Sequence, residues 1–343
     1  MNFKPQTNVD LAELTTMRIG GKAKYFTEVS DPAQIPDIFT WLKAKDLPHI
    51  ILSGGSNTVF DDGTFNGLVI KIDIKGFQII REDDESTVIK AGSGENWDET
   101  VRRCVDKGLA GIEALSGIPG NCGAAPVQNI GAYGQEIKDT LESVEVFDTS
   151  SNTVTSLSKS ECQLSYRISI FKSSQKGRYI ITAISLKLSK KPPEIPQYKD
   201  LIEYFADKKV ISPSVSEIRR AVIEIRSTKF ADPNKVPNSG SFFKNPIVNA
   251  EQAKALQARF PDIKAFETED GQYKLFAGWL IEQAGLKGKQ LDHVQVDPNH
   301  ALVLENTGKA TQNELMALIT EVQAEVKNKF GIQLEPEPVI VKF

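Results

Sequence analysis

The segment at residues 238–246 combines a small flexible turn with aromatic and polar side chains. It reads NSGSFFKNP, so Ser241 follows Gly240 and precedes Phe242 and Phe243. A serine hydroxyl on a glycine turn can lie close to a ligand, and neighbouring aromatic rings keep the surroundings dry. Such an alcohol can give its proton to a strong base, for example an enolate. Taken alone, the pattern is more typical of the start of a strand with an ordinary aromatic core, because aromatic residues mostly pack.

A glycine-rich segment at residues 52–60, LSGGSNTVF, is a candidate phosphate-binding loop. Glycines let backbone N–H groups approach a phosphate, and adjacent hydroxyl and amide side chains add hydrogen-bond donors. The candidate cradle comprises Gly54, Gly55, Ser56, Asn57 and Thr58. An ordinary hairpin turn uses the same residue types, so this segment alone leaves both interpretations open.

Two further segments bear on cofactor binding. AGSGENWDE, residues 91–99, begins like the dinucleotide fingerprint but has Trp97 at the third glycine, where close packing of helix on strand is required. A Rossmann fold is therefore not expected. Residues 111–136, GIEALSGIPGNCGAAPVQNIGAYGQE, contain six glycines and predict neither helix nor strand, yet they are too apolar for a solvated loop. They suit a large planar ligand with a phosphate tail, or a tightly packed long loop.

The strand signals lie before residue 190. Apolar and β-branched runs predict strands at residues 49–54, 67–72, 77–80, 86–92, 143–148 and 179–189. A helix is predicted within residues 96–108, where apolar side chains recur at helical spacing. The proline-rich segment 190–197 cannot continue a sheet and predicts a connector.

The second half of the chain has stronger helix signals. Ser214 with Glu217, and Thr311 with Glu314, form capping-box patterns, and Gly331 predicts the end of the last helix. The fold class expected is α+β, with a strand-rich first part and a mixed second part.

Composition narrows the classes of partner. A net charge of −4 gives no basic face for nucleic acid, so small molecules are the expected partners. Cys104, Cys122 and Cys162 lack CxxC spacing and suit buried thiols in a reducing compartment. His49 and His293 have no acidic or cysteine neighbours at ligand spacing, so we predict no metal site. Neither a signal-peptide core nor a membrane-spanning run is present. We expect a cytoplasmic monomer with no membrane partner.

Several of these segments together resemble the type I UDP-N-acetylenolpyruvoylglucosamine reductase (MurB) family. The similarity covers nearly the whole chain, in long matches that follow one another in the right order. They are TTMRIGGKAKYF (15–26), SGGSN (53–57), SGIPGNCGAAPVQNIGAYG (116–134), YRISIFK (166–172), RSTKFADP (226–233), NSGSFFKNP (238–246), AGWLIEQAGLKG (277–288) and LEPEP (334–338).

The resemblance implies a flavin-binding fold of the vanillyl-alcohol-oxidase or PCMH type. Its two FAD-binding subdomains would span residues 1–75 and 76–228, and a substrate-binding domain would span 229–337. Residues 338–343 would return to the first subdomain as a terminal strand. The implied cofactor is FAD, and its implied contacts are Gly54, Gly55, Ser56, Asn57, Thr58, Ser116, Gly117, Ile118, Pro119, Gly120, Gly123, Ala124 and Arg226.

The implied reaction is the NADPH-dependent reduction of UDP-N-acetylglucosamine enolpyruvate to UDP-N-acetylmuramate, in peptidoglycan precursor synthesis. Arg167 would grip the substrate carboxylate with its planar guanidinium, which stays charged. Ser241 occupies the family's proton-donor position. Glu337 would assist as a hydrogen-bond donor or through water, and we expect it to be protonated in the closed site. The implied substrate-binding residues are Tyr133, Tyr166, Tyr198, Lys229, Asn245 and His300.

The chain departs from the family pattern at two positions. Val339 stands where an arginine often follows the glutamate, so any contact of that arginine is lost or supplied elsewhere. His300 stands where glutamine or asparagine frequently contacts the nucleotide, and it would make that contact pH-sensitive. A surface histidine in a turn is the alternative.

Two other functions remain open on the sequence. A flavin oxidase or dehydrogenase of the same fold would act on another alcohol or lactone, but it leaves Lys229, Tyr198 and Asn245 unexplained. A non-catalytic nucleotide-sugar-binding protein would bind without turnover, although Ser241 and Arg167 argue against it.

Overall fold

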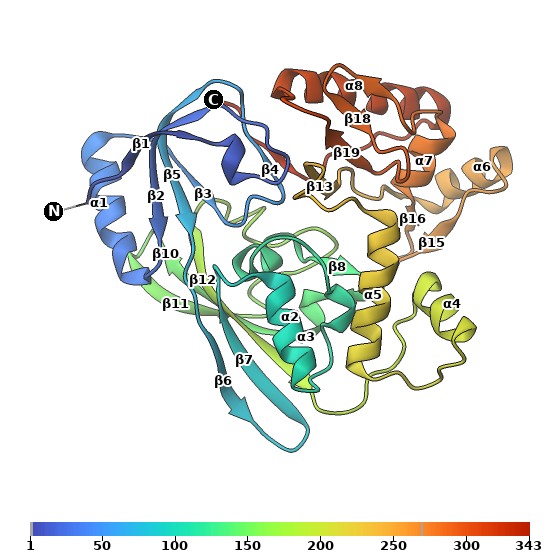
Figure 1. Ribbon diagram of the computed structural model, residues 1–343, viewed down its shortest axis with the longest axis horizontal. Coiled ribbons are helices and arrows are strands. Elements are labelled where there is room, and N and C mark those ends of the chain that lie inside the picture. The colour runs from blue at the N-terminus through green and yellow to red at the C-terminus, as the bar shows by residue number, and fades with distance from the viewer. Residues whose placement is uncertain (1–2, 269) are drawn as a thin grey trace. The chain divides into compact units, whose positions relative to one another are not determined.

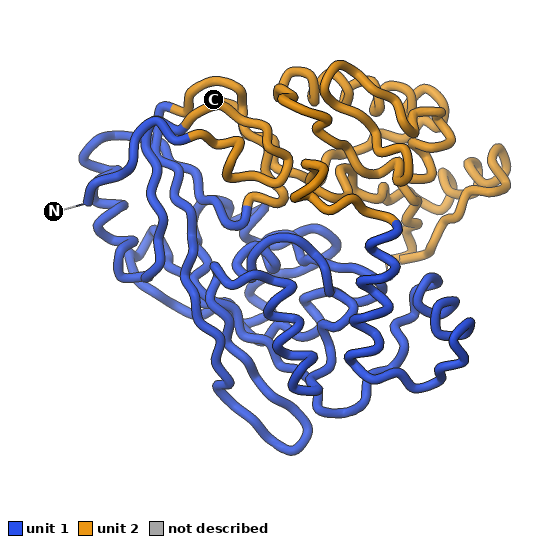
Figure 2. The backbone as a smooth tube through the Cα atoms, viewed as in Figure 1, with its two compact units in different colours: residues 1–9, 23–54, 66–228 blue, residues 10–22, 55–65, 229–343 orange. Residues whose placement is uncertain are grey.

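The computed structural model describes residues 3–268 and 270–343 (Figure 1). The chain forms two compact units, each assembled from three separate segments (Figure 2). Unit 1 comprises residues 1–9, 23–54 and 66–228, and unit 2 comprises residues 10–22, 55–65 and 229–343. The expected division into two FAD-binding subdomains and a substrate domain remains a prediction about function.

The largest sheet of unit 1 is antiparallel, with the strand order β11-β10-β12-β7-β6. Its central strand, β12, has an almost continuously buried apolar run, whereas the edge strand β11 is mostly exposed. Both patterns follow from the sequence, because a central strand has two covered faces and an edge strand can remain polar. The strands are β6 (Phe77–Glu82), β7 (Ser86–Gly92), β10 (Leu141–Asp148), β11 (Thr153–Ser158) and β12 (Tyr179–Ser189). The strands predicted in this region are confirmed.

A second sheet has the order β1-β2-β5-β3, and its strands β3 and β5 run parallel. Helix α1 (Ile35–Lys45) buries Ile38 and Leu42 in one apolar cluster with Leu68 and Ile70 of β5. The strands are β1 (Gln6–Asp10), β2 (Lys22–Val29), β3 (His49–Leu52) and β5 (Thr64–Ile72).

Helix α2 (Trp97–Asp106) confirms the helix predicted within residues 96–108. Asn96 caps it by accepting the Glu99 N–H at 3.0 Å, and Trp97 is 1% exposed. Trp97 donates its indole N–H to the carbonyl oxygen of Leu115 at 3.0 Å. The residue that breaks the dinucleotide fingerprint therefore anchors the glycine-rich segment on the helix.

Residues 111–136 are more regular than the composition predicts. They contain 3₁₀ helices at Glu113–Leu115 and Cys122–Gln128, and a short hairpin of β8 (Gly131–Ala132) and β9 (Gln135–Glu136). The prediction of no regular structure is wrong there, because 3₁₀ turns need only local hydrogen bonds. The further helices of unit 1 are α3 (Ile137–Thr140), α4 (Lys199–Asp207) and α5 (Val215–Lys229), whose last residue belongs to unit 2.

Unit 2 is built on one large apolar cluster between short strands and helices. Phe242 and Phe243 lie in it, with Leu315, Ile319 and further apolar residues of α8 (Gln312–Phe330). Its first sheet has the order β13-β19-β18-β17 and its second β14-β16-β15, while β20 pairs in parallel with β4. The strands are β4 (Thr58–Val59), β13 (Asn238–Ser241), β14 (Ile247–Val248), β15 (Ala265–Glu267), β16 (Tyr273–Leu275), β17 (Gln290–Leu291), β18 (Val294–Val296), β19 (Val303–Asn306) and β20 (Val339–Ile340). The other helices are α6 (Ala250–Arg259) and α7 (Ala277–Gln283).

Both predicted capping boxes are present. Ser214 and Glu217 exchange hydrogen bonds at the start of α5, and Thr311 and Glu314 do so at the start of α8. Gly331 ends α8 with a φ of 72°. Among the described residues, no helix has the length and apolar character needed to cross a membrane, and no three metal-ligating side chains form a cluster.

The α8 cap makes a measurable prediction. Thr311→Ala removes the Oγ1 acceptor that holds the Glu314 N–H at 3.2 Å, so unfolding free energy should fall by about 1 kcal/mol. Thr320→Ala is the matched control, because the Thr320 hydroxyl donates to the Met316 carbonyl in the middle of the same helix. The control should stay within about 0.5 kcal/mol of the parent in urea titrations. Equal losses in both variants would contradict the capping role.

Candidate active site

Two of the predicted cofactor loops pack backbone against backbone in unit 1. A Cβ on Gly54 would lie 3.0 Å from Asn121 Oδ1 and 3.1 Å from Gly120 Cα. A Cβ on Gly123 would lie 2.5 Å from the Ser93 Cβ. Segments around residues 54, 93 and 120–123 therefore converge, and only glycine allows their close approach.

Buried hydroxyls at this convergence support a phosphate-bearing ligand. Within the described residues, the Oγ atoms of Ser53 and Ser93 are buried and have no hydrogen-bond partner in the protein. Buried polar atoms normally have partners, so these two are candidates to bind a ligand. The converging glycines and the two hydroxyls fit a flavin nucleotide. Sequence reasoning missed both serines, because a lone serine carries no signal before the loops are brought together.

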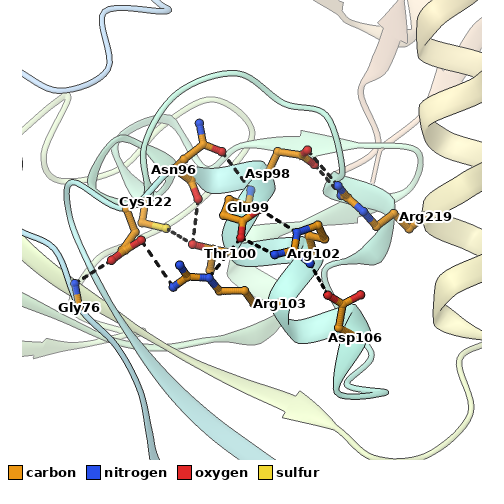
Figure 3. Close-up of polar contacts among 11 residues, drawn as sticks. Gly76, Asn96, Asp98, Glu99, Thr100, Arg102, Arg103, Asp106, Cys122 and Arg219 are labelled. Atoms are coloured by element: carbon orange, nitrogen blue, oxygen red, sulfur yellow. Dashed lines mark hydrogen bonds and ion pairs between the residues drawn. The ribbon is translucent and has the colours of Figure 1, made fainter.

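Asp98 of α2 links the loop at residues 116–120 to α5, and Figure 3 shows its contact with Arg219. The Gly117 N–H donates to Asp98 Oδ1 at 2.6 Å, and Arg219 of α5 donates to the two carboxylate oxygens at 2.5 and 2.9 Å. Burial alone would raise the pKa of Asp98, but the hydrogen bonds from Arg219 and Gly117 bring this pKa below its ordinary value. The carboxylate stays charged and joins the three segments.

Arg226, one of the predicted cofactor contacts, lies against this loop. A Cβ on Gly117 would be 3.0 Å from its Nε, so glycine leaves room for the guanidinium. Arg226 also hydrogen-bonds the Tyr133 side chain, and burial raises the pKa of that tyrosine to about 12. The Tyr133 and Tyr198 rings meet edge to face at 5.2 Å. The structure thus brings together four predicted residues of unit 1: Gly117, Tyr133, Tyr198 and Arg226.

Arg167 lies in a tight turn of unit 1. Its backbone has a φ of 57°, and its guanidinium donates to the carbonyl oxygens of Asn129 and Gly131, each at 3.4 Å. The guanidinium also lies 5.5 Å from the ring centroid of Tyr166. These contacts are all local to unit 1 and hold the cation at the end of the glycine-rich segment.

Ser241 and Glu337 lie on adjoining backbone segments of unit 2. The Glu337 N–H donates to the Phe242 carbonyl at 2.8 Å, and Phe243 pairs with Pro336 in an antiparallel bridge. Glu337 is 9% exposed. The pairing brings together a serine and a glutamate that lie far apart in the sequence.

Asn57 supports the same segment, rather than lying with Gly54 in unit 1. Its side-chain amide donates to the Glu337 carbonyl at 3.4 Å, and its own carbonyl accepts the Val339 N–H at 2.9 Å. Val339, which replaces the family's arginine, is 44% exposed and pairs with Thr58. The chain passes from unit 1 to unit 2 between Gly54 and Gly55, so the predicted cradle is divided between them.

The predicted nucleotide-binding residues of unit 2 have other partners as well. His300 stacks on Phe230 with ring centroids 4.8 Å apart, and its Nδ1 accepts the Leu302 N–H at 3.3 Å, which places the ring hydrogen on Nε2. Burial first, and then the charge of Lys229, lower the pKa of His300. Asn245 accepts the Ala277 N–H at 2.9 Å and so caps α7. His300 thus offers a neutral N–H donor beside a lysine.

The fold and the converging loops define the class of protein. Residues 23–158 match the family model described as "FAD binding domain". The crystal structure of 6-hydroxy-D-nicotine oxidase from Arthrobacter nicotinovorans aligns with a TM-score of 0.56 at 13% identity, covering 97% of this chain and 87% of that one. The protein is an FAD-containing oxidoreductase with an α+β flavin-binding fold, as predicted.

The family follows from matches along the whole length. Residues 232–341 match the model "UDP-N-acetylenolpyruvoylglucosamine reductase, C-terminal domain". The reductase of that name from Dechloromonas aromatica is 41% identical over 99% of this chain and 100% of its own length. The crystal structure of the Thermus caldophilus reductase (MurB) aligns with a TM-score of 0.70 at 23% identity, covering 99% of each chain. This chain belongs to the UDP-N-acetylenolpyruvoylglucosamine reductase family, which confirms the resemblance.

The packing of the 116–120 loop predicts a specific loss of cofactor. Gly117 and Gly108 both have a φ of 71°, so alanine at either position meets the same backbone strain. Only at Gly117 would the new methyl group crowd Arg226 and Ile223, because nothing lies within 4 Å at Gly108. A crowding cost of about 1.4 kcal/mol would make Gly117→Ala release FAD about tenfold more readily than Gly108→Ala.

FAD release can be followed by the rise of flavin fluorescence on dilution of the holoprotein. Gly108→Ala is the control and should retain FAD like the parent. Equal retention by the two variants would argue against a role of this loop in binding the cofactor.

Proposed function

We propose that this protein catalyses the NADPH-dependent reduction of UDP-N-acetylglucosamine enolpyruvate to UDP-N-acetylmuramate, in peptidoglycan precursor synthesis. The observation that carries the proposal is the 41% identity to a reductase of this name over the full length of both chains. The buried Ser53 and Ser93 hydroxyls and the glycine loops support FAD as its cofactor. We further propose that the enzyme acts in the cytoplasm as a monomer, on small-molecule substrates.

FAD would be held by the converging loops, with Ser53, Ser93, Gly54, Gly123 and the 116–120 segment around it. When bound, FAD supplies hydride transfer from NADPH to the enolpyruvyl double bond. The protein's own groups then have two tasks. They stabilise negative charge on the substrate carboxylate, and they deliver one proton to the substrate carbon that is bonded to this carboxylate.

Arg167 is the proposed carboxylate ligand. The carboxylate becomes more electron-rich when hydride adds to the conjugated double bond, so a fixed cation lowers the energy of the transition state. A guanidinium can donate two parallel hydrogen bonds to the carboxylate oxygens. Its two carbonyl contacts, each at 3.4 Å, orient the guanidinium.

Ser241 Oγ is the proposed proton donor, and Glu337 is its proposed support. The proton moves from Oγ to the substrate carbon next to the carboxylate, and solvent then returns a proton to Oγ. Phe242 is fully buried and holds Glu337 through a backbone hydrogen bond, so the strand pairing fixes the donor segment.

The remaining substrate contacts are proposed for the nucleotide and sugar. Lys229 and the N–H of His300 would face the diphosphate, with Asn245 beside them. Tyr133, Tyr166 and Tyr198 would contact the rest of the substrate.

The first expected outcome concerns colour. Purified protein should carry the yellow chromophore of FAD, and NADPH should bleach it without air, after which the enolpyruvyl substrate should restore the colour. A colourless protein that cannot be reconstituted with FAD would refute the function. Bleaching by an alcohol substrate in place of NADPH would favour an oxidase of the same fold.

The second expected outcome separates the two half-reactions. Ser241→Ala should leave flavin reduction by NADPH nearly unchanged and slow reoxidation by the enolpyruvyl substrate by about 10²–10⁴-fold, as removal of a general acid does. Ser239→Ala is the matched control in the same turn, because the Ser239 hydroxyl is buried and points toward the Met17 sulfur at 4.0 Å. The measurement is anaerobic stopped-flow absorbance. Equal slowing of both half-reactions would contradict the role of Ser241.

A further inference from the structure

Asn129 is an uncharged polar residue with no solvent exposure, in the middle of the glycine-rich segment. Its side chain is 0% exposed and its backbone has a φ of 45°, in the left-handed region where asparagine is among the tolerated residues. A buried amide is costly unless its hydrogen bonds are satisfied. The partners of Asn129 therefore indicate what the residue holds in place.

The Asn129 amide joins three backbone segments. Its Nδ2 donates to Glu136 Oε2 at 2.8 Å and to the Ser165 carbonyl at 3.1 Å, while its Oδ1 accepts the Lys138 N–H at 3.1 Å. The backbone carbonyl of Asn129 also accepts from the Arg167 guanidinium. One residue thus connects the 3₁₀ segment, the start of α3 and the turn that carries Arg167.

The Ser165 contact fixes the turn itself. Ser165 and Ile168 exchange both backbone hydrogen bonds, at 3.0 and 3.1 Å, and Arg167 lies between them with a φ of 57°. The Ser165 carbonyl accepts from both Ile168 and Asn129, so the amide ties the closed end of the turn to the 3₁₀ segment. An arginine in left-handed conformation needs such support, because the turn is strained.

We infer that Asn129 is a positioning residue for Arg167, and that it sets the direction in which the guanidinium meets the substrate carboxylate. The inference rests on the proposed function, in which Arg167 binds that carboxylate. Asn129 makes two kinds of contact that act on Arg167. Its side chain holds the turn through Ser165, and its carbonyl accepts one of the guanidinium hydrogen bonds. In this role Asn129 acts through Arg167.

The test variant is Asn129→Asp, which keeps the shape, the acceptor for Lys138 and the tolerance for positive φ. It loses both donated hydrogen bonds and places a carboxylate against the oxygens of Glu136 and Ser165. The matched control is Asn152→Asp, because Asn152 has a φ of 56° and is exposed at the turn between β10 and β11. Arg167→Ala and the double variant of Asn129→Asp with Arg167→Ala complete the set.

The readout is anaerobic stopped-flow absorbance of both half-reactions of the holoenzyme. In Asn129→Asp we expect flavin reduction by NADPH to stay within about twofold, while reoxidation by UDP-N-acetylglucosamine enolpyruvate slows by about 10- to 100-fold, as misplacement of a positioned group does. The double variant should be no slower than Arg167→Ala alone, because Asn129 acts through Arg167. Asn152→Asp should match the parent in both half-reactions.

Several results would overturn the inference. These are unchanged reoxidation in Asn129→Asp, equal slowing of both half-reactions, or effects that multiply in the double variant. If the flavin of Arg167→Ala is reoxidised by substrate at the parent rate, the proposed contact between Arg167 and the carboxylate is refuted. The inference about Asn129 is then refuted as well, because it depends on that contact. If Asn129→Asp loses its flavin, Asn129→Gly accepts the same φ without the added charge, and the same selective slowing is expected. Loss of flavin from both variants would assign Asn129 to the general fold of the segment and overturn a specific role.

Discussion

The candidate site depends on a packing constraint: backbone must lie directly on backbone where the cofactor loops converge. Gly54 approaches Gly120 and Asn121, and Gly123 approaches Ser93, at distances that leave no room for a Cβ or only a crowded one. Helices and sheets normally satisfy buried N–H and C=O groups, but such loops have too few of those partners. Polar side chains inside the protein must therefore bind the buried backbone groups of these loops.

Three buried or partly buried side chains in unit 1 accept hydrogen bonds from such backbone N–H groups. Asp98 accepts the Gly117 N–H, Glu113 accepts the Gly111 N–H, and Asn129 accepts the Lys138 N–H. Each also has a side-chain partner: Arg219 for Asp98, Gln135 for Glu113 and Glu136 for Asn129. The glycine-rich segment is thus held by a small set of polar side chains in addition to its own buried apolar residues, such as Ile112 and Leu115. These contacts fix the stretch that contains Tyr133 and whose carbonyl oxygens accept hydrogen bonds from Arg167.

The sequence predicted those parts of the fold that rest on local signals. The strands at 86–92 and 179–189 match β7 and β12 residue for residue, because short apolar runs rich in β-branched residues favour strands over helices. The α8 start and end were visible in Thr311, Glu314 and Gly331. Long-range relations were not visible. Nothing local in residues 10–22 or 55–65 indicates that they belong to the same compact unit as residues 229–343. Likewise, the roles of Asp98 and Asn129 could not be predicted, because their hydrogen-bond partners lie in other segments of the chain.

Of the two opening alternatives for NSGSFFKNP, the aromatic core is confirmed, and it is compatible with the proton-donor role proposed for Ser241. Phe242 and Phe243 are at most 1% exposed and belong to the core of unit 2. Their backbone pairs with Pro336 and Glu337, so the buried rings determine which residues of the two segments face each other. A shift of one residue in this register would turn the alternating side chains to the opposite face. The aromatic core is therefore what keeps Ser241 and Glu337 on adjoining segments, and the proton transfer proposed for Ser241 depends on that core.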